Sequence, residues 1–336
     1  MTNDYEWMEK VDWGSVTPEK VSRIISLIKK IIETTDSDEQ EEFRYYLWDS
    51  YAHQGGIYKE TAPTLSILLT LLRQEMLYSK EWILRTINGI TIVHGNETKL
   101  SQKIYEMIKE NKDLFFEYLK NDNYKYRWLS LEIIGKLIHD EDNVFAWIGN
   151  HLETESNVSV ITRGIYVIGR IGEATKDVNV KRKIYNYLKN YETLNLFIRC
   201  VAIYSRMTLN HKYISQQDWM RLFYFFSVVT DVDHNIEHFI IRLFIVIDKF
   251  SPNEKVEKYV GFLKCTKSPF LCQIIIHNML WGFFARENDI LGKKSKNEKE
   301  LLLALLGCEP FWLEGDTSFL ADFGLPTDKV SLSEKI

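Results

Sequence analysis

The sequence predicts an all-α protein built as an α-solenoid of stacked antiparallel helix pairs, and three observations lead to this prediction. Apolar residues recur at spacings of three and four from Val21 to Leu306, whereas strict two-residue alternation never persists. The 336 residues include only 16 Gly and 6 Pro, so the tight hairpins that depend on these residues are scarce. The third observation is an internal repeat of about 36 residues, which is typical of stacked helical units.

Composition limits the class of protein further. Hydrophobic residues make up 45% of the chain and the formal net charge is −5, so there is ample apolar surface for a core and disorder is excluded. The four cysteines form no C-x-x-C pair, and the acidic N-terminus lacks the apolar segment of a signal peptide. No run of 18 apolar residues occurs. We therefore expect a cytoplasmic chain with reduced thiols.

Helix starts are marked by hydroxyl residues that precede Gln or Glu by three positions. In such a capping box the two side chains satisfy backbone N–H groups reciprocally. We expect helices to begin at Ser37-x-x-Gln40, Ser251-Pro252-Asn253-Glu254 and Ser295-x-x-Glu298. The expected organisation is a single solenoid over residues 1–336, with N-terminal capping helices in 1–36 and an irregular C-terminal cap in 307–336.

The repeat rests on residues that recur at a spacing of 36. The polar residues are Asn121, Asn157 and Thr193, and each is followed six positions later by an arginine, namely Arg127, Arg163 and Arg199. A unit of helix, turn and helix cannot bury its apolar stripe alone, so it must stack on further copies. The repeat therefore predicts the solenoid.

Three segments carry a family resemblance. The stretch 161–172 resembles the second helix of a HEAT repeat, 124–137 is a weaker version, and 48–72 is similar to the first repeats of a group of bacterial HEAT-like proteins. The resemblance implies a HEAT-like or ARM-like superhelix that binds other macromolecules along a concave surface. It also implies, for some bacterial members, a role as immunity proteins for secreted toxins.

The electrostatic pattern predicts a partner-binding surface. Residues 161–209 hold nine Lys/Arg and three Asp/Glu, whereas residues 1–60 hold seven and thirteen. A basic pair recurs at i and i+7, a spacing that places both members on one helix face. The predicted partner-binding residues are Arg163 and Arg170, Arg199 and Arg206, and Arg242 and Lys249. We expect them on the solvent side of three successive helices, where they would form a basic trough for an acidic protein.

An alternative remains open for the first arginine of each pair. In HEAT repeats such an arginine bonds the polar residue six positions earlier, as part of a structural ladder. Arg127, Arg163 and Arg199 fit this pattern as well. Arg170, Arg206 and Lys249 have no such ladder role.

One motif resembles a zinc site. His234-Asn235-Ile236-Glu237-His238 matches the H-x-x-E-H pattern of inverted zinc peptidases, in which two histidines on one helix face bind the metal. A third ligand from a distant helix is not evident, and Asp231 and Asp233 suit the positive end of a helix. We expect a helix start here, with no metal and no cofactor.

Several aromatic residues, one turn and one lysine-rich stretch remain to be placed. We expect Trp82, Trp128, Trp147, Phe223 and Phe226 in the core. The turn with His53, Gln54 and Tyr58 is a second candidate for partner binding. The lysine-rich stretch 292–299 is expected to be a solvated loop.

The leading hypothesis is a non-catalytic scaffold, because no phosphate-binding glycine loop and no nucleophile elbow occurs in the chain. The alternative is a HEAT-like DNA-binding protein or alkylpurine DNA glycosylase, which grips duplex DNA in a basic groove. The acidic composition of the chain, and the lack of Trp on 161–209, weigh against that alternative.

Overall fold

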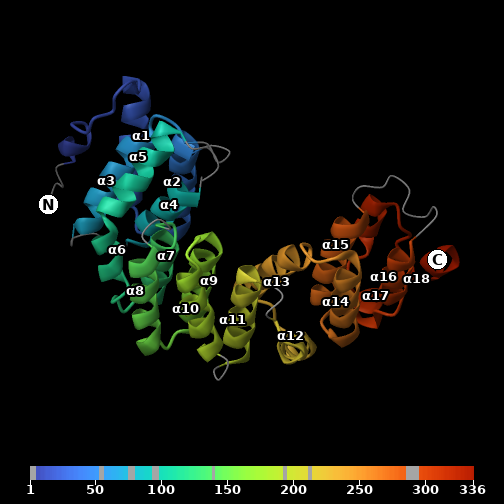
Figure 1. Ribbon diagram of the computed structural model, residues 1–336. Coiled ribbons are helices and arrows are strands. Elements are labelled where there is room, and N and C mark those ends of the chain that lie inside the picture. The colour runs from blue at the N-terminus through green and yellow to red at the C-terminus, as the bar shows by residue number, and fades with distance from the viewer. Residues whose placement is uncertain are drawn as a thin grey trace. The chain divides into compact units, whose positions relative to one another are not determined.

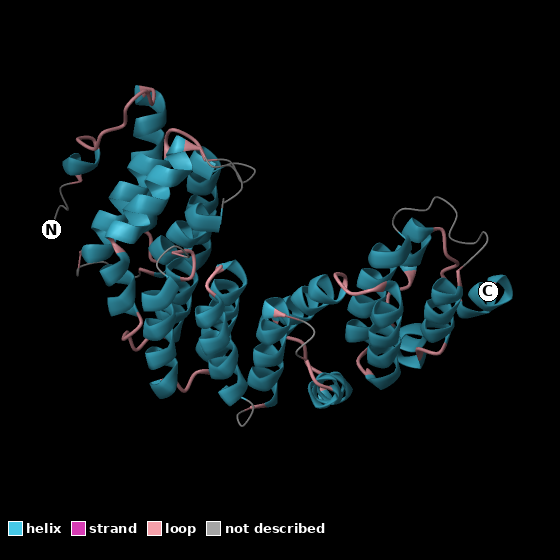
Figure 2. Cartoon of the chain, viewed as in Figure 1, coloured by secondary structure: helices cyan, strands magenta, loops and turns pink. Residues whose placement is uncertain are grey.

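In the computed structural model, every regular element of the described residues is a helix, and no strand occurs among them (Figure 2). The structure describes residues 5–52, 57–74, 80–92, 98–137, 141–191, 195–210, 214–284 and 295–336. The prediction of an all-α protein is confirmed. In these ranges no helix combines the length and the apolar character needed to cross a bilayer.

The chain divides into two compact units, residues 1–180 and 181–336, and each is described by itself. The first unit contains η1 (Glu6–Met8), α1 (Pro18–Glu33), α2 (Ser37–Ala52), α3 (Thr61–Arg73), α4 (Glu81–Ile92), α5 (Lys99–Glu110), α6 (Lys112–Tyr118), α7 (Tyr124–Ile134), α8 (Glu141–Thr154) and α9 (Val158–Ala174). Helices α2, α4, α7 and α9 pack in a row, each against the next (Figure 1). Helix α1 packs on α2, α3 on α4, α6 on α7 and α8 on α9.

In the second unit the helices form two rows. It contains α11 (Leu196–Leu209), α12 (Gln216–Val228), α13 (His234–Ile247), α14 (Pro252–Cys265), α15 (Pro269–Phe284), α16 (Lys296–Leu306), α17 (Glu309–Glu314), η6 (Ser318–Phe323) and α18 (Lys329–Lys335). Helices α11, α13, α15 and α17 form one row, and α12, α14, α16 and α18 form the other (Figure 1). Helix α10 (Val178–Asn190) crosses the boundary between the units.

Most helices start where a side chain accepts the first backbone N–H groups. Capping boxes at Ser251 and Ser295 are present, so both predicted starts are confirmed. The third start differs by one residue, because the Asp36 carboxylate accepts hydrogen bonds from the N–H groups of Asp38 and Glu39. A carboxylate binds these positively polarised N–H groups more strongly than a hydroxyl does.

Helices α7, α8 and α9 are close-packed because small residues lie at their contacts. A Cβ atom on Gly135, just after α7, would lie 2.5 Å from a Val167 methyl group on α9. A Cβ atom on Gly164 would lie 2.7 Å from Leu152 on α8. Both distances are shorter than van der Waals contact, so glycine is required for these helices to approach as they do.

Three expectations about individual segments are corrected or fall outside the described residues. Trp147 is 46% exposed and stacks on Phe116 with ring centroids 4.3 Å apart, so it is not a core residue, whereas Trp82 and Phe226 are buried as expected. The C-terminal segment 307–336 is largely helical, and α16 starts within the lysine-rich stretch. His53 and Gln54 lie outside the described residues, while Tyr58 is 42% exposed.

Candidate binding surface

Arg163 on α9 is held by an acidic and an aromatic residue of α7. Its guanidinium donates a hydrogen bond to the Glu132 carboxylate, with Nη1 and Oε1 2.5 Å apart. Its Cζ atom lies 4.2 Å from the centre of the Trp128 ring, within the range of a cation–π contact. Arg163 therefore ties α9 to α7, and its charge is neutralised locally.

Lys136, just after α7, contributes a buried amine to the same row of helices. Its side chain reaches α4, where Nζ lies 2.8 Å from the Asn88 carbonyl oxygen, 2.5 Å from Asn88 Oδ1 and 2.6 Å from Thr91 Oγ1. Only 6% of the residue is exposed. Three acceptors match the three N–H groups of an ammonium ion, and the last turn of a helix favours a cation. The contact thus joins α7 to α4.

Arg170 lies two helical turns beyond Arg163, on the same face of α9. It is half-buried, and no hydrogen bond or ion pair joins it to a residue whose side chain the structure describes, a set that leaves out residues 138–143. Its positive charge disfavours protonation of the buried Lys136 amine. The face formed by α7 and α9 therefore presents one guanidinium that the described protein leaves without an anion.

The charges on this face shift the pKa of Lys136. Burial is the largest cause and lowers this pKa from 10.5 to about 7, because an ammonium loses hydration in the interior. Glu132 opposes the shift, and Arg170 and Arg163 add to it. The amine is thus near its deprotonation point at neutral pH.

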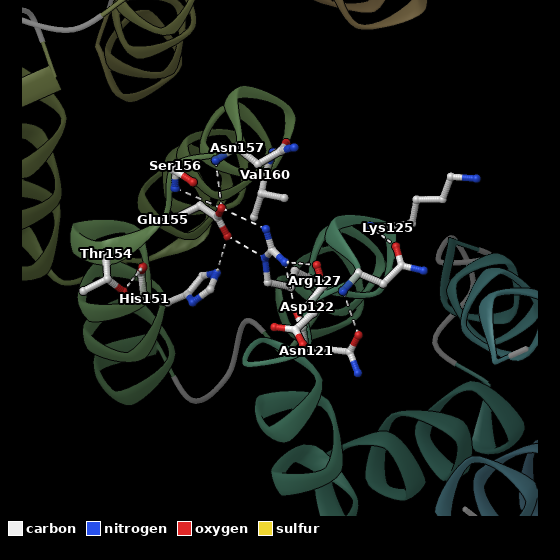
Figure 3. A network of polar contacts seen from close by, with 11 residues as sticks. Asn121, Asp122, Lys125, Arg127, His151, Thr154, Glu155, Ser156, Asn157 and Val160 are labelled. Atoms are coloured by element: carbon white, nitrogen blue, oxygen red, sulfur yellow. Dashed lines mark hydrogen bonds and ion pairs between the residues drawn. The ribbon is translucent and has the colours of Figure 1, made fainter. Parts of the chain in front are cut away.

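A separate polar network, shown in Figure 3, uses Arg127 at the N-terminal end of α7. The guanidinium donates to the backbone carbonyl oxygens of Asn121 and Asp122, at 2.7 and 2.9 Å. It also donates to both oxygens of Glu155, at 2.7 and 3.0 Å. The expected ladder bond to the residue six positions earlier is confirmed for Arg127, through the main chain of Asn121.

Glu155 is the centre of this network. Besides Arg127, it accepts hydrogen bonds from the backbone N–H groups of Ser156 and Asn157, and His151 Nε2 lies 3.3 Å from its Oε2 (Figure 3). Burial alone would raise the pKa of Glu155, but the hydrogen bonds from Arg127 and from the main chain outweigh it and lower that pKa. Burial also lowers the pKa of His151. The network fixes the turns before α7 and α9, which is a structural role.

The ladder is not periodic, because the two arginines occupy different positions relative to their helix caps. Asn123 caps α7 and Asn157 caps α9. Arg127 therefore lies four residues after its cap, and Arg163 lies six after its own. Two residues rotate a helix position by about 200°, so the side chains point to different neighbours.

The expectation that Arg206 lies on a solvent face is wrong. Arg206 on α11 is 2% exposed, and its Nη2 donates to Asp218 Oδ1 on α12 at 2.8 Å. The other Asp218 oxygen accepts from the N–H and the hydroxyl of Ser215, which caps α12. Burial would raise the pKa of Asp218, but the bonds from Ser215 and Arg206 lower it. The i, i+7 spacing predicts which face of α11 carries Arg206, but it does not indicate that α12 covers this face.

The remaining predicted binding residues lie in the second unit. Arg199 is half-buried on α11, Arg242 Nε donates to His238 Nε2 at 3.1 Å on α13, and Lys249 is exposed just beyond α13. Arg163 and Arg170 lie in the first unit. Arg163 and Arg170 therefore share one face of α9, whereas a trough across all three helices stays a prediction.

The zinc motif forms the first turns of α13, as expected for a helix start. Asp233 caps this helix by accepting a hydrogen bond from the Ile236 N–H. One ring nitrogen of His238, which a metal would need, accepts the Arg242 hydrogen bond instead. Within the described ranges, no three His, Cys, Asp or Glu side chains gather as a metal site.

Sequence reasoning missed Glu132 and Lys136. A signal was present, since Trp128, Glu132 and Lys136 follow one another at four-residue spacing, and polar residues at this spacing share a helix face. The HEAT-like pattern of this segment indicates its apolar stripe but not the contacts of its polar stripe.

No known protein family and no curated protein matches the sequence.

Proposed function

We propose that this chain is a non-catalytic α-solenoid of HEAT-like helix pairs that binds an acidic surface of another protein at the face of α7 and α9. The rows of helices in each unit, in which alternate helices pack on one another, support the solenoid. The resemblance of 161–172 to a HEAT helix supports the same interpretation. A role in neutralising a toxin belongs to this proposal by family analogy alone.

The observation that carries the proposal is the state of Arg170. This half-buried guanidinium has no anionic partner among the side chains that the structure describes, which leave out residues 138–143, whereas Arg163 on the same face pairs with Glu132. Arginine binds carboxylates with two parallel hydrogen bonds, and a partly buried guanidinium gains more from such a bond than an exposed one. A carboxylate of a partner protein would complete this face.

The face fits a protein better than a nucleic acid. Glu132 neutralises Arg163, so the face around Arg170 carries few uncompensated charges. Nucleic acids are bound through many phosphate contacts, usually by a domain with a net positive charge, whereas this chain has a net charge of −5. One or two carboxylates on a protein surface match the small number of cations here.

The test compares Arg170→Glu with a matched charge reversal at an exposed position, Lys176→Glu, two residues after the end of α9. The probes are a fluorescent oligoglutamate peptide, as a minimal acidic protein segment, and a duplex DNA of similar charge. We expect the wild type and Lys176→Glu to bind oligoglutamate with an affinity that falls as salt rises, and Arg170→Glu to lose most of this binding.

Equal oligoglutamate binding by Arg170→Glu and the wild type would refute this site. Tight DNA binding by the wild type, lost in Arg170→Glu, would favour the nucleic-acid alternative. Release of an alkylated base from DNA by the wild type, through hydrolysis of its glycosidic bond, would refute the non-catalytic assignment.

A further inference from the structure

We propose that the exposed face of α13 and α15 binds an acidic amphipathic helix of a partner protein, with Ile245 and Trp281 as apolar anchors and Arg242 and Lys249 as the cations beside them. This surface goes beyond the proposed function, since it lies in the unit that does not contain Arg170. It follows from large side chains that are exposed and yet held in fixed positions by their neighbours.

Helices α13 and α15 turn their exposed faces to the same side. Phe244 of α13 and Phe283 of α15 both contact the Tyr259 ring of α14, with ring centroids 5.1 and 6.2 Å apart. A Cβ atom on Gly282 of α15 would lie 2.8 Å from Asp248 Oδ1, just after α13, so the C-terminal ends of the two helices lie side by side. The faces that both helices turn away from α14 therefore form one continuous surface.

Large apolar side chains lie on this surface at the same level of the row. Ile245 is 53% exposed, and Trp281 in the last turn of α15 is 59% exposed. Ile245 lies one turn before Asp248. Trp281 directly precedes Gly282, whose contact with Asp248 brings both anchors close to each other. Packed helices lie about 8–10 Å apart and a helix with its side chains is about 10–12 Å wide, so one partner helix covers both anchors.

The indole of Trp281 is held in position although most of it is exposed. Its N–H donates a hydrogen bond to His277 Nε2, one turn earlier, at 3.1 Å. Its ring also packs edge-on against Phe323 of η6, with ring centroids 5.7 Å apart. A side chain that is already fixed loses little conformational entropy when a partner covers it, and Trp is among the residues that contribute most to protein interfaces. Trp281 is thus a preorganised anchor.

Two cations border the anchors and determine the charge of the partner. Arg242 and Lys249 lie three residues before and four residues after Ile245, a spacing that places all three on one side of α13. The Arg242 guanidinium is oriented by His238, because its Nε donates to His238 Nε2 at 3.1 Å. Carboxylates that flank the apolar side chains of a partner helix pair with both cations.

The acidic groups of α13 do not cancel this charge. Asp248 is engaged with α14, since its Oδ1 accepts a hydrogen bond from the Tyr259 hydroxyl at 3.2 Å and lies 3.6 Å from Lys255 Nζ. Glu237 is in the first turn of α13, about 120° or more around the helix from both cations. A surface of apolar groups bordered by two cations favours an acidic amphipathic partner over a basic one.

The experiment measures the binding of a designed peptide to the whole chain by fluorescence anisotropy. The probe is a labelled peptide of about 18 residues with Leu at i, i+3, i+4 and i+7 and Glu on both flanks of this stripe. One control peptide has the same composition in scrambled order, and another has Lys in place of Glu. We expect the acidic helix to bind, to gain helical circular dichroism on binding, and to bind more weakly as salt rises.

Variants test the named residues. Trp281→Ala and Ile245→Ser should each weaken binding about tenfold or more, because each removes an anchor that the partner buries. Lys249→Glu should weaken it about fivefold, chiefly through slower association. Leu303→Ala, at a position on α16 that is 58% exposed, is the matched control and should bind as the wild type. Because the face of α7 and α9 is also proposed to attract acidic peptides, the series is repeated in Arg170→Glu, where we expect the same losses.

Equal affinity of the wild type, Trp281→Ala and Ile245→Ser for the acidic helix would overturn the proposal, and so would equally tight binding of the scrambled or the lysine peptide. Should Trp281→Ala lower the melting temperature, Lys249→Glu decides, because an exposed lysine contributes little to folding.

Two other occupants would also overturn the proposal. Binding to phosphatidylglycerol vesicles that depends on Trp281, without peptide binding, would assign the surface to a membrane. A dimer that is lost in Ile245→Ser would assign it to a second copy of the chain. Each of these outcomes leaves the proposed function at α7 and α9 standing, because Arg170 takes no part in them.

Discussion

Replacing Arg206 with Met should destabilise the second unit strongly, because the substitution breaks a buried ion pair. Arg206 is 2% exposed and bonds the Asp218 carboxylate at 2.8 Å. Removing one partner of such a pair costs about 3–5 kcal/mol, since the other charge stays buried without compensation. Asp218 keeps its bonds to Ser215, and Arg221 lies 3.6 Å away, so we expect a value near 3 kcal/mol.

The assay is urea unfolding followed by circular dichroism, with hydrogen exchange of the amides of α11 and α12 to locate the loss. The matched control is Lys267→Met, an exposed lysine of the same unit, which should change the free energy of unfolding by less than about 0.5 kcal/mol. The double variant Arg206→Met/Asp218→Asn should be more stable than the sum of the single losses predicts, because no charge is stranded.

The pH dependence provides a check on the same pair. The pKa of Asp218 is lowered in the folded protein, so its contribution is present above the unfolded value near 4 and is lost as the pH falls through the lower folded value. Arg206→Met should weaken this dependence. Unfolding of Arg206→Met within about 0.5 kcal/mol of the wild type would refute the assignment of Arg206 as a structural residue.

Three further predictions concern the first unit. Gly135→Ala should cost about 1–3 kcal/mol, because its Cβ meets Val167, and Val167→Ala in the same chain should recover part of the loss; a neutral Gly135→Ala would contradict the close contact. Glu155→Gln should destabilise the protein most at neutral pH and progressively less below about pH 4.5, because the pKa of Glu155 is lowered on folding. Thermal melts at several pH values measure this, and a difference between variant and wild type that does not change with pH would contradict it. Because the pKa of Lys136 falls from 10.5 to about 7 on folding, the wild type should gain about 3 kcal/mol of stability relative to Lys136→Met between pH 7 and pH 9.5; urea titrations showing parallel pH profiles would disprove this.

Much of the fold follows from local sequence signals. The spacing of apolar residues indicates helices, and the capping boxes at Ser251 and Ser295 mark starts that the structure confirms, because such bonds span only three residues. The contacts of the candidate binding residues could be predicted from the sequence less well. A helical wheel assigns Arg206 to a face, but the burial of that face depends on Asp218 of the next helix.

The same limit explains the arginines on α9. The spacing of seven residues correctly places Arg163 and Arg170 on one face of a helix. Whether each has a partner depends on α7, where the Glu132 carboxylate pairs with Arg163. Contacts between residues 31 positions apart leave no local trace in a single sequence.

The two bonds of Asp218 imply an order of events in folding. Its bond to Ser215 spans three residues and can form as soon as the first turn of α12 does, whereas the bond to Arg206 requires α11 and α12 to meet. An early turn therefore holds the carboxylate in place before the arginine arrives. Docking of the two helices then closes a contact whose acceptor is already oriented, which lowers the entropy lost at the moment of association.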